Sequence, residues 1–134
     1  MSYLLDTSVV TRLGRPEIVG RIRELDGGGI ARSTLTDLEV GYSARNAEEW
    51  DRLQAALGAF RPIDVQPAHV RRAGQVQRML AERGLRGRKV PDLVIAAVGE
   101  AESLTVLHYD VDFELIAGVT GQPAEWVVPR GSID

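Results

Sequence analysis

Short apolar runs alternate along this chain with longer segments whose apolar residues recur at the helical period, and this alternation constrains the fold most strongly. A short run has the length of one strand, and the longer segment after it has the length of a crossover helix. The pattern predicts an α/β fold with a mainly parallel sheet of about five strands. The predicted strands cover residues 3–5, 29–32, 62–65, 104–108 and 126–128. The predicted helices cover residues 9–13, 16 to the glycines at 27–29, 34–44, 47–60, 67–83, 91–102 and 113–119.

The composition limits both the domain count and the kinds of site. The 134 residues contain no internal repeat, low-complexity run or linker, so we predict a single domain over residues 1–134. The chain contains no cysteine, which excludes disulfides, thiolate chemistry and cysteine zinc sites. Its two histidines, His69 and His108, are too few for a histidine-built metal site. Any metal would be bound through oxygen, which favours Mg²⁺, Mn²⁺ or Ca²⁺.

Charge and apolar content bear on location and partners. The first ten residues have no basic start, and no run of about 18 apolar residues could span a bilayer, so we expect a soluble, cytoplasmic protein with no membrane contact. The net charge of −3 gives no general attraction to nucleic acid, so an RNA would have to be held by local basic patches. One basic segment precedes residue 92; it is either a solvated surface or a set of RNA phosphate contacts. It comprises Arg83, Arg86, Arg88 and Lys89, and Arg12 and Arg15 are weaker candidates of the same kind.

Four acidic residues fall where parallel topology would bring them together. Asp6 and Asp110 each come just after a predicted strand, and the carboxyl ends of parallel strands form the edge where ligands bind. Asp92 lies in the first turn of a helix that must run antiparallel to the next strand, so its start returns to the same edge. Glu39 lies about one turn into the helix that leaves the second strand. We therefore expect all four carboxylates on one rim of the sheet.

Such a cluster of carboxylates has a direct chemical consequence. Close like charges raise one another's pKa unless a cation binds between them. Mg²⁺ suits a site with few protein ligands and several waters. A bound Mg²⁺ or Mn²⁺ can lower the pKa of a water and neutralise charge on a phosphodiester, and two ions about 4 Å apart could clamp the attacking and leaving oxygens.

Each acidic residue also has a purely structural interpretation. Glu39 completes the capping-box pattern Thr36-x-x-Glu39. Asp92 could simply favour a helix N-terminus, and Asp6 could be a helix cap. Asp110 and Asp112 could likewise cap the helix that contains Phe113. These roles do not exclude metal binding, and the joint placement on one rim argues for it.

A few other residues with chemical potential are expected to be structural. Asp64 alternates with apolar neighbours on a strand and is predicted to be solvated. His108 is predicted to be a strand-end histidine rather than a ligand or base. Trp50 and Trp126 are predicted to pack in the fold rather than stack on bases.

Taken in order, four motifs resemble the VapC-type toxins of bacterial toxin–antitoxin pairs, a group of PIN-domain ribonucleases. The resemblance covers nearly the whole chain, and the motifs are specific through their order and spacing rather than singly. They are Leu4-Leu5-Asp6-Thr7-Ser8, Thr36-x-x-Glu39-x-Gly41-Tyr42-Ser43-Ala44-Arg45, Pro91-Asp92-Leu93-x-Ile95-Ala96-Ala97 and His108-Tyr109-Asp110-x-Asp112-Phe113-x-x-Ile116-Ala117.

The resemblance implies a three-layer α/β/α PIN fold and an endoribonuclease that depends on Mg²⁺ or Mn²⁺. The family's acidic quartet corresponds to Asp6, Glu39, Asp92 and Asp110. Asp112 falls on a further acidic position that binds metal directly or through water. Thr7 or Ser8 would orient Asp6 or a metal-bound water.

The resemblance also implies partners. The toxins usually form homodimers and are silenced by a small VapB-type antitoxin, whose DNA-binding end takes the complex to its own operator DNA. The implied substrates are structured RNAs, mainly tRNA or a ribosomal RNA loop, and their cleavage inhibits translation.

Other functional classes fit less well. A haloacid dehalogenase phosphatase needs Asp-x-Asp after its first strand, whereas here Asp110-Val111-Asp112 follows a late strand. A response-regulator receiver needs paired acids after the first strand and a lysine after the last, and the chain has neither. The stronger rival is a PIN-like module that binds RNA or protein without cutting. Replacement of one quartet member separates these cases, because only an enzyme would lose cleavage.

Overall fold

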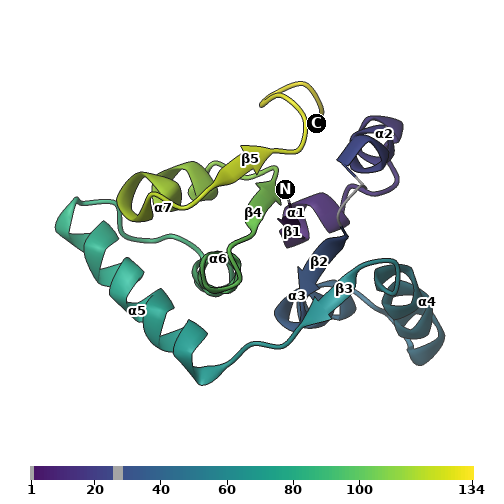
Figure 1. Cartoon of the computed structure of the whole chain (residues 1–134). Coiled ribbons are helices and arrows are strands. Elements are labelled where there is room, and N and C mark those ends of the chain that lie inside the picture. Colours follow the sequence, from purple (N-terminus) through teal and green to yellow (C-terminus); the bar gives the residue numbers. More distant parts are fainter. Residues whose placement is uncertain (1, 26–28) are drawn as a thin grey trace.

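A five-stranded parallel sheet forms the centre of the molecule (Figure 1). The computed structural model describes residues 2–25 and 29–134. The strand order is β3-β2-β1-β4-β5, and each neighbouring pair runs parallel. The strands are β1 (Tyr3–Leu5), β2 (Ile30–Ser33), β3 (Arg61–Ile63), β4 (Thr105–His108) and β5 (Ala124–Trp126). The chain builds outward from β1 to one side and then to the other, so the order reverses between β1 and β4.

Helices connect the strands and cover both faces of the sheet. They are α1 (Thr7–Val10), α2 (Pro16–Leu25), α3 (Thr34–Gly41), α4 (Ala47–Leu57), α5 (Pro67–Glu82), α6 (Val90–Ala101) and α7 (Asp112–Thr120). Because successive side chains of a strand point to opposite faces, Leu4 and Leu5 of the central strand belong to different cores. Leu4 packs with α5, α6 and α7, whereas Leu5 packs with α1, α2 and α4. The predicted three-layer α/β/α architecture with a parallel sheet is confirmed.

Helix α6 packs closely against β4. Its residues from Asp92 to Gly99 are all buried, which explains why this segment is apolar on nearly every face. At Gly99 an added Cβ would lie 2.8 Å from Cγ2 of Val106 on β4, so glycine permits this close approach of helix and strand. The close packing fixes the start of α6, and with it Asp92, relative to the end of β4.

The predicted boundaries of several elements need correction. The last strand covers Ala124–Trp126 rather than residues 126–128, because His108 pairs in register with Trp126; Val127 still donates its N–H to the His108 carbonyl at 2.8 Å. The third strand ends at Ile63, two residues early, and the first helix begins at Thr7 rather than residue 9. Of the glycines predicted to end α2, residues 27 and 28 lie outside the described part. None of the helices described here has the length and apolar character needed to cross a bilayer.

Candidate metal centre

The ends of β1 and β4 place two aspartates at the point where the strand order reverses. Leu5 and Leu107 are paired across these parallel strands, and the Asp6 N–H donates to the Leu107 carbonyl at 2.9 Å. Asp110 follows β4 after a single intervening residue, Tyr109. The predicted position of Asp6 and Asp110 at the carboxyl edge of the sheet is therefore confirmed, and this edge is where open α/β sheets bind ligands.

Asp6 is a helix cap and also a buried acid. Its Oδ2 accepts the N–H of Ser8 at 2.9 Å, which caps α1, and the residue is only 1% exposed. Its Oδ1 is buried and has no hydrogen-bond donor among the described residues. Burial raises the pKa of Asp6 to about 6, and the charge of Glu39 adds to the rise, while hydrogen bonds from Ser8 and Thr7 oppose it. One carboxylate oxygen thus remains free for another partner.

Ser8 connects the two strand ends. Besides donating its N–H to Asp6, it accepts the N–H of Tyr109 through its hydroxyl at 2.9 Å. The residue therefore fixes the segment after β1 against the segment after β4. This contact orients Asp6 as predicted, and it also sets the path of the chain into Asp110.

Asp92 is the second deeply buried acid. It lies in the first turn of α6 and is 5% exposed, and its Oδ2 makes no hydrogen bond within the described residues. Burial raises the pKa of Asp92 well above its ordinary value, and the charges of Asp6, Asp110 and Asp112 add to this while Lys89 opposes it. The N-terminus of α6 alone therefore does not offset the negative charge of the Asp92 carboxylate.

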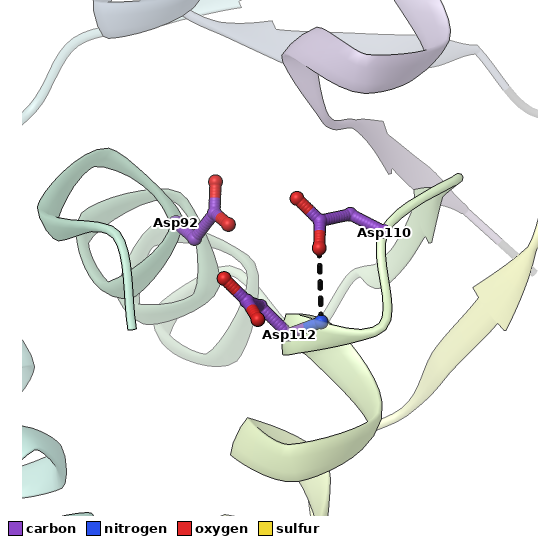
Figure 2. A group of neighbouring side chains, drawn as sticks. All are labelled: Asp92, Asp110 and Asp112. Carbon is purple, nitrogen blue, oxygen red and sulfur yellow. Dashed lines mark hydrogen bonds between the residues drawn. The ribbon is translucent and has the colours of Figure 1, made fainter. Parts of the chain in front are cut away.

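Three of the aspartates form a compact cluster (Figure 2). One ligand oxygen each from Asp92, Asp110 and Asp112 can be chosen so that all lie within 4.8 Å of one another. The Asp112 N–H donates to Oδ1 of Asp110 at 3.0 Å, which also serves the start of α7. Carboxylates at this spacing can hold a metal ion, and the donor set consists of oxygen alone.

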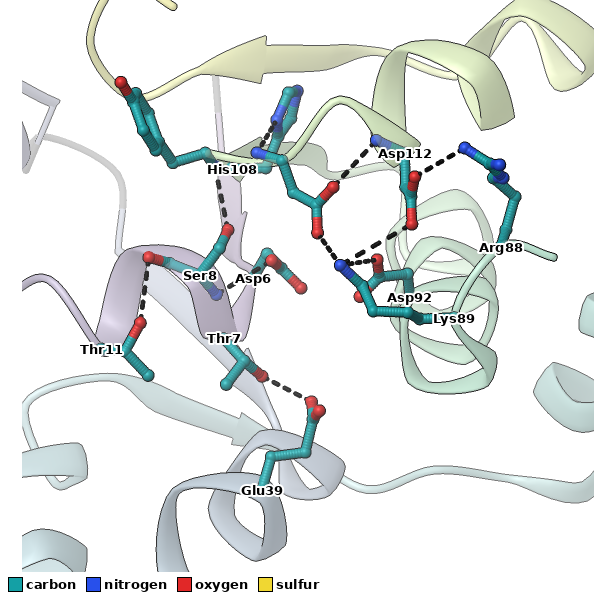
Figure 3. A network of polar contacts seen from close by, with 12 residues as sticks. Asp6, Thr7, Ser8, Thr11, Glu39, Arg88, Lys89, Asp92, His108 and Asp112 are labelled. Carbon is teal, nitrogen blue, oxygen red and sulfur yellow. Dashed lines mark hydrogen bonds and ion pairs between the residues drawn. The ribbon is translucent and has the colours of Figure 1, made fainter. Parts of the chain in front are cut away.

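Two of the four basic residues predicted to contact RNA lie against these carboxylates (Figure 3). Lys89 hydrogen bonds to Asp110, and its Nζ lies 3.5 Å from Oδ2 of Asp92 and 3.7 Å from Oδ2 of Asp112. Arg88 donates from Nη1 to Asp112 at 2.9 Å. Burial of the ammonium lowers the pKa of Lys89, but the Asp110 hydrogen bond and the three negative charges outweigh this and raise it. Burial likewise raises the pKa of Asp110, but hydrogen bonds from Lys89 and the Asp112 N–H bring it below its ordinary value.

The other two basic residues lie away from the cluster. Arg83 is exposed and donates to the Gly118 carbonyl at 3.4 Å, at the far end of α7. Arg86 is exposed in the loop before α6, and only its carbonyl accepts a bond, from Arg88. RNA contact by this segment stays a prediction.

Glu39 lies beside Asp6 and outside the three-aspartate cluster. Its Oε1 accepts the Thr7 hydroxyl at 2.7 Å, and the hydroxyls of Thr7 and Thr36 lie 2.9 Å apart. The capping-box interpretation of Thr36 and Glu39 is wrong, because Ser33 caps α3 by accepting the Leu35 N–H at 3.1 Å. The Thr7 hydroxyl therefore orients Glu39.

The expectations about neighbouring residues have different outcomes. His108 is buried at the end of β4 between Phe113 and Trp126, with ring centroids 5.1 and 4.9 Å away. Burial lowers the pKa of His108 to about 4, so the ring is neutral near pH 7. Asp64 is exposed, as predicted, whereas Trp50 remains 46% exposed and packs less than expected. The weaker RNA candidates, Arg12 and Arg15, form ion pairs with Asp134.

The central position of Lys89 was missed from sequence. The usable signal was its spacing of three residues before Asp92 at a helix start, which puts both side chains on one face.

Comparison with known proteins identifies the family. The family model described as "PIN domain" matches residues 3–119, which include all five acidic residues at the candidate centre. Ribonuclease VapC51 of Mycobacterium tuberculosis is 58% identical over all of this chain and 98% of that protein. The chain belongs to the VapC family of PIN-domain ribonucleases. A second VapC relative in the same species, Ribonuclease VapC21, is 41% identical over 97% of this chain and 96% of its own length.

Solved structures agree with this VapC fold. VapBC2 from Rickettsia felis, solved with a DNA fragment from its promoter, superposes with a TM-score of 0.79 at 20% identity over 93% of this chain and 98% of that chain. VapBC-5 from Mycobacterium tuberculosis, a member of the VapBC toxin–antitoxin systems, gives a TM-score of 0.64 at 25% identity over 93% and 96%. At 20% identity, the likeness to VapBC2 from Rickettsia felis supports the fold alone.

Proposed function

We propose that this VapC-family chain is a metal-dependent endoribonuclease that hydrolyses phosphodiester bonds in structured RNA. The observation that carries the proposal is a pair of buried carboxylate oxygens, Asp6 Oδ1 and Asp92 Oδ2, without a hydrogen-bond donor in the described structure. Buried charges are costly unless paired, and here both face a cluster of further carboxylates. A divalent cation would compensate both oxygens, because Asp6 Oδ1 has no hydrogen-bond donor among the described residues and Asp92 Oδ2 has only the Lys89 ammonium at 3.5 Å.

The donor set indicates which cation would bind. The oxygens come from carboxylates, with no cysteine in the chain and with His108 buried between aromatic rings. Such hard ligands favour Mg²⁺ or Mn²⁺. We infer that Asp6, Asp92 and Asp110 would hold the ion, with Asp112 as a direct or water-mediated ligand.

The chain's own groups can support hydrolysis without a side-chain nucleophile. A bound divalent ion would lower the pKa of a water and neutralise phosphodiester charge. Glu39, whose Oε1 accepts the Thr7 hydroxyl at 2.7 Å, would accept a hydrogen bond from that water. Water attacks phosphorus and the 3′ oxygen leaves, which yields a 5′-phosphate and a 3′-hydroxyl. A 2′,3′-cyclic phosphate product would overturn this version, because the RNA's own 2′-hydroxyl would then be the nucleophile.

The substrates are proposed to be tRNA or a ribosomal RNA loop, whose cleavage would inhibit translation in the cytoplasm. Support comes from the relatives named as ribonucleases and from the basic residues beside the acidic centre. Exposed Arg83 and Arg86 could contact phosphates beyond the cut site, and Arg88 and Lys89 could do so next to it.

We further propose a VapB-type antitoxin and a homodimer as partners, with operator DNA bound through the antitoxin. Several relatives by fold are toxin–antitoxin complexes, and that from Rickettsia felis is bound to promoter DNA. An apolar groove of about 490 Å³ lies between α3, α5 and α6, and its lining includes the exposed Leu38, Val70 and Val90. Asp64 is the one charged residue of this lining, so two copies could meet there with little repulsion. We assign this groove to the second copy.

The test is an RNA cleavage assay with purified, antitoxin-free protein. Total cellular RNA is incubated with Mg²⁺ or Mn²⁺, with and without EDTA, and new 5′ ends are sequenced. Asp6→Asn is the test variant, and Asp51→Asn is the matched control because Asp51 is exposed on α4. We expect discrete metal-dependent cuts that disappear in Asp6→Asn and persist in Asp51→Asn. The absence of cuts from folded protein with metal would favour the binding-module alternative.

A further inference from the structure

Lys89 is an unusual residue for this chain. Sixteen residues are lysine or arginine, and Lys89 is the single lysine among them. Its ammonium reaches the aspartate cluster, where it hydrogen bonds to Asp110 and pairs with Asp92 at 3.5 Å and Asp112 at 3.7 Å (Figure 3). These are the same three residues whose oxygens approach within 4.8 Å. The ammonium therefore lies in the space that a metal ion would share with them.

The rest of the Lys89 side chain is not built into the core. The residue is the N-cap of α6, its side chain makes no capping bond, and it is 60% exposed. The ammonium can therefore leave the cluster by rotation of its own stem, without disturbing the packed helix behind it. By contrast, Arg88 is 25% exposed and contacts only Asp112 among the carboxylates, at the outer side of the cluster.

We propose that Lys89 is a tethered counter-cation that partly offsets the negative charge of Asp92, Asp110 and Asp112 when no ion is bound and swings out to solvent when a divalent ion takes its place. The proposal rests on the function proposed above and adds a residue that sets the metal affinity.

Simple geometry and charge make the two cations mutually exclusive. Mg²⁺ binds carboxylate oxygens at about 2.1 Å, and an ammonium does so at about 2.8 Å. Both cannot contact three oxygens that lie within 4.8 Å of one another, and at such separation they would repel strongly. A compact ammonium on a flexible stem suits this exchange better than the planar guanidinium of arginine.

The exchange lowers the apparent metal affinity, because only molecules whose cluster is free of the ammonium can bind the ion. If that fraction is about nine-tenths, removal of the ammonium tightens metal binding about tenfold. Mn²⁺ binding is measured directly, by the electron paramagnetic resonance of free Mn²⁺, for wild type, Lys89→Met and Arg86→Met. Arg86→Met removes one positive charge from the same loop, and Arg86 forms no ion pair with a carboxylate among the described residues. We expect about tenfold tighter binding for Lys89→Met and less than about twofold change for Arg86→Met.

The single lysine permits a second measurement on the wild-type protein, which needs no variant to fold. An N-hydroxysuccinimide ester acylates amines, and Arg-specific digestion with mass spectrometry gives the rate at Lys89 and at the α-amino group. An ammonium held by three carboxylates reacts slowly. Saturating Mg²⁺ should accelerate Lys89 at least about fivefold relative to Na⁺ of equal ionic strength, with the α-amino rate as internal reference.

The outcomes distinguish failure of the Lys89 exchange from failure of the proposed metal-dependent activity. Faster acylation with Mg²⁺ together with tighter Mn²⁺ binding by Lys89→Met supports the exchange. If wild type binds Mn²⁺ while Lys89 stays unreactive and Lys89→Met binds no more tightly, the exchange is refuted and metal-dependent cleavage is unaffected. If neither wild type nor Lys89→Met binds Mn²⁺, both the exchange and the proposed metal-dependent activity fail.

Discussion

Replacement of Asp6 by asparagine should stabilise the protein in chelator, although the same change should abolish cleavage. Burial raises the pKa of Asp6 from 3.8 to about 6, so the folded state resists ionisation of this group more than the unfolded state does. The resulting cost is absent below the unfolded pKa, grows as pH rises through the interval between the two values, and is constant above about pH 6. The wild-type protein therefore loses stability as pH rises through this window.

The size of the effect follows from the two pKa values. A difference of about two units corresponds to about 3 kcal/mol at neutral pH, and the 1% exposure of Asp6 leaves little solvent screening. Asparagine can keep the bond from the Ser8 N–H through its amide oxygen, so we expect a net gain of about 2 kcal/mol. The gain should shrink to near zero at about pH 4.5, where the ionisation cost has fallen to about 1 kcal/mol.

The assay is urea unfolding with EDTA at about pH 4.5 and about pH 7.5 for wild type, Asp6→Asn and the exposed control Asp51→Asn. Excess Mg²⁺ should reverse the order at the higher pH, because only wild type gains binding energy from the ion. A pH-independent difference, or an Asp6→Asn protein less stable than wild type in EDTA near neutral pH, would refute the argument that a buried, uncompensated charge is present.

Three further changes test other contacts. Thr7→Val removes the 2.7 Å bond to Glu39 and should lower cleavage at least about tenfold with little change in Tm; unchanged cleavage would contradict a positioned Glu39. Gly99→Ala places a methyl 2.8 Å from Val106 and should cost about 1–3 kcal/mol in urea unfolding; equal stability would mean that β4 can yield. Leu38→Asp puts a charge on a residue that is 70% exposed in the apolar groove, and light scattering should then find monomer; a persistent dimer would place the interface elsewhere.

The functional site was predictable where it depends on strand ends. Asp6 and Asp110 had to follow β1 and β4, and parallel pairing brings those ends together regardless of side-chain detail. Asp92 followed from the antiparallel return of α6. Glu39 was placed on the correct rim, but its capping role was wrong, because the true cap is Ser33 and its bond partner Thr7 is 32 residues away in sequence.

The sequence by itself determined the order and type of the elements, the oxygen-only ligand set and the edge of the sheet where acids gather, because these depend on local periodicity and composition. Tertiary structure alone decided which carboxylates lie within reach of one another, the registry of β5 on β4, and the position of the Lys89 ammonium among three aspartates. These depend on how elements are rotated and packed against one another and on which rotamer a side chain then adopts. The packing of the elements and the side-chain rotamers are not encoded in the period of a single segment, because both are set by contacts between residues far apart in the chain.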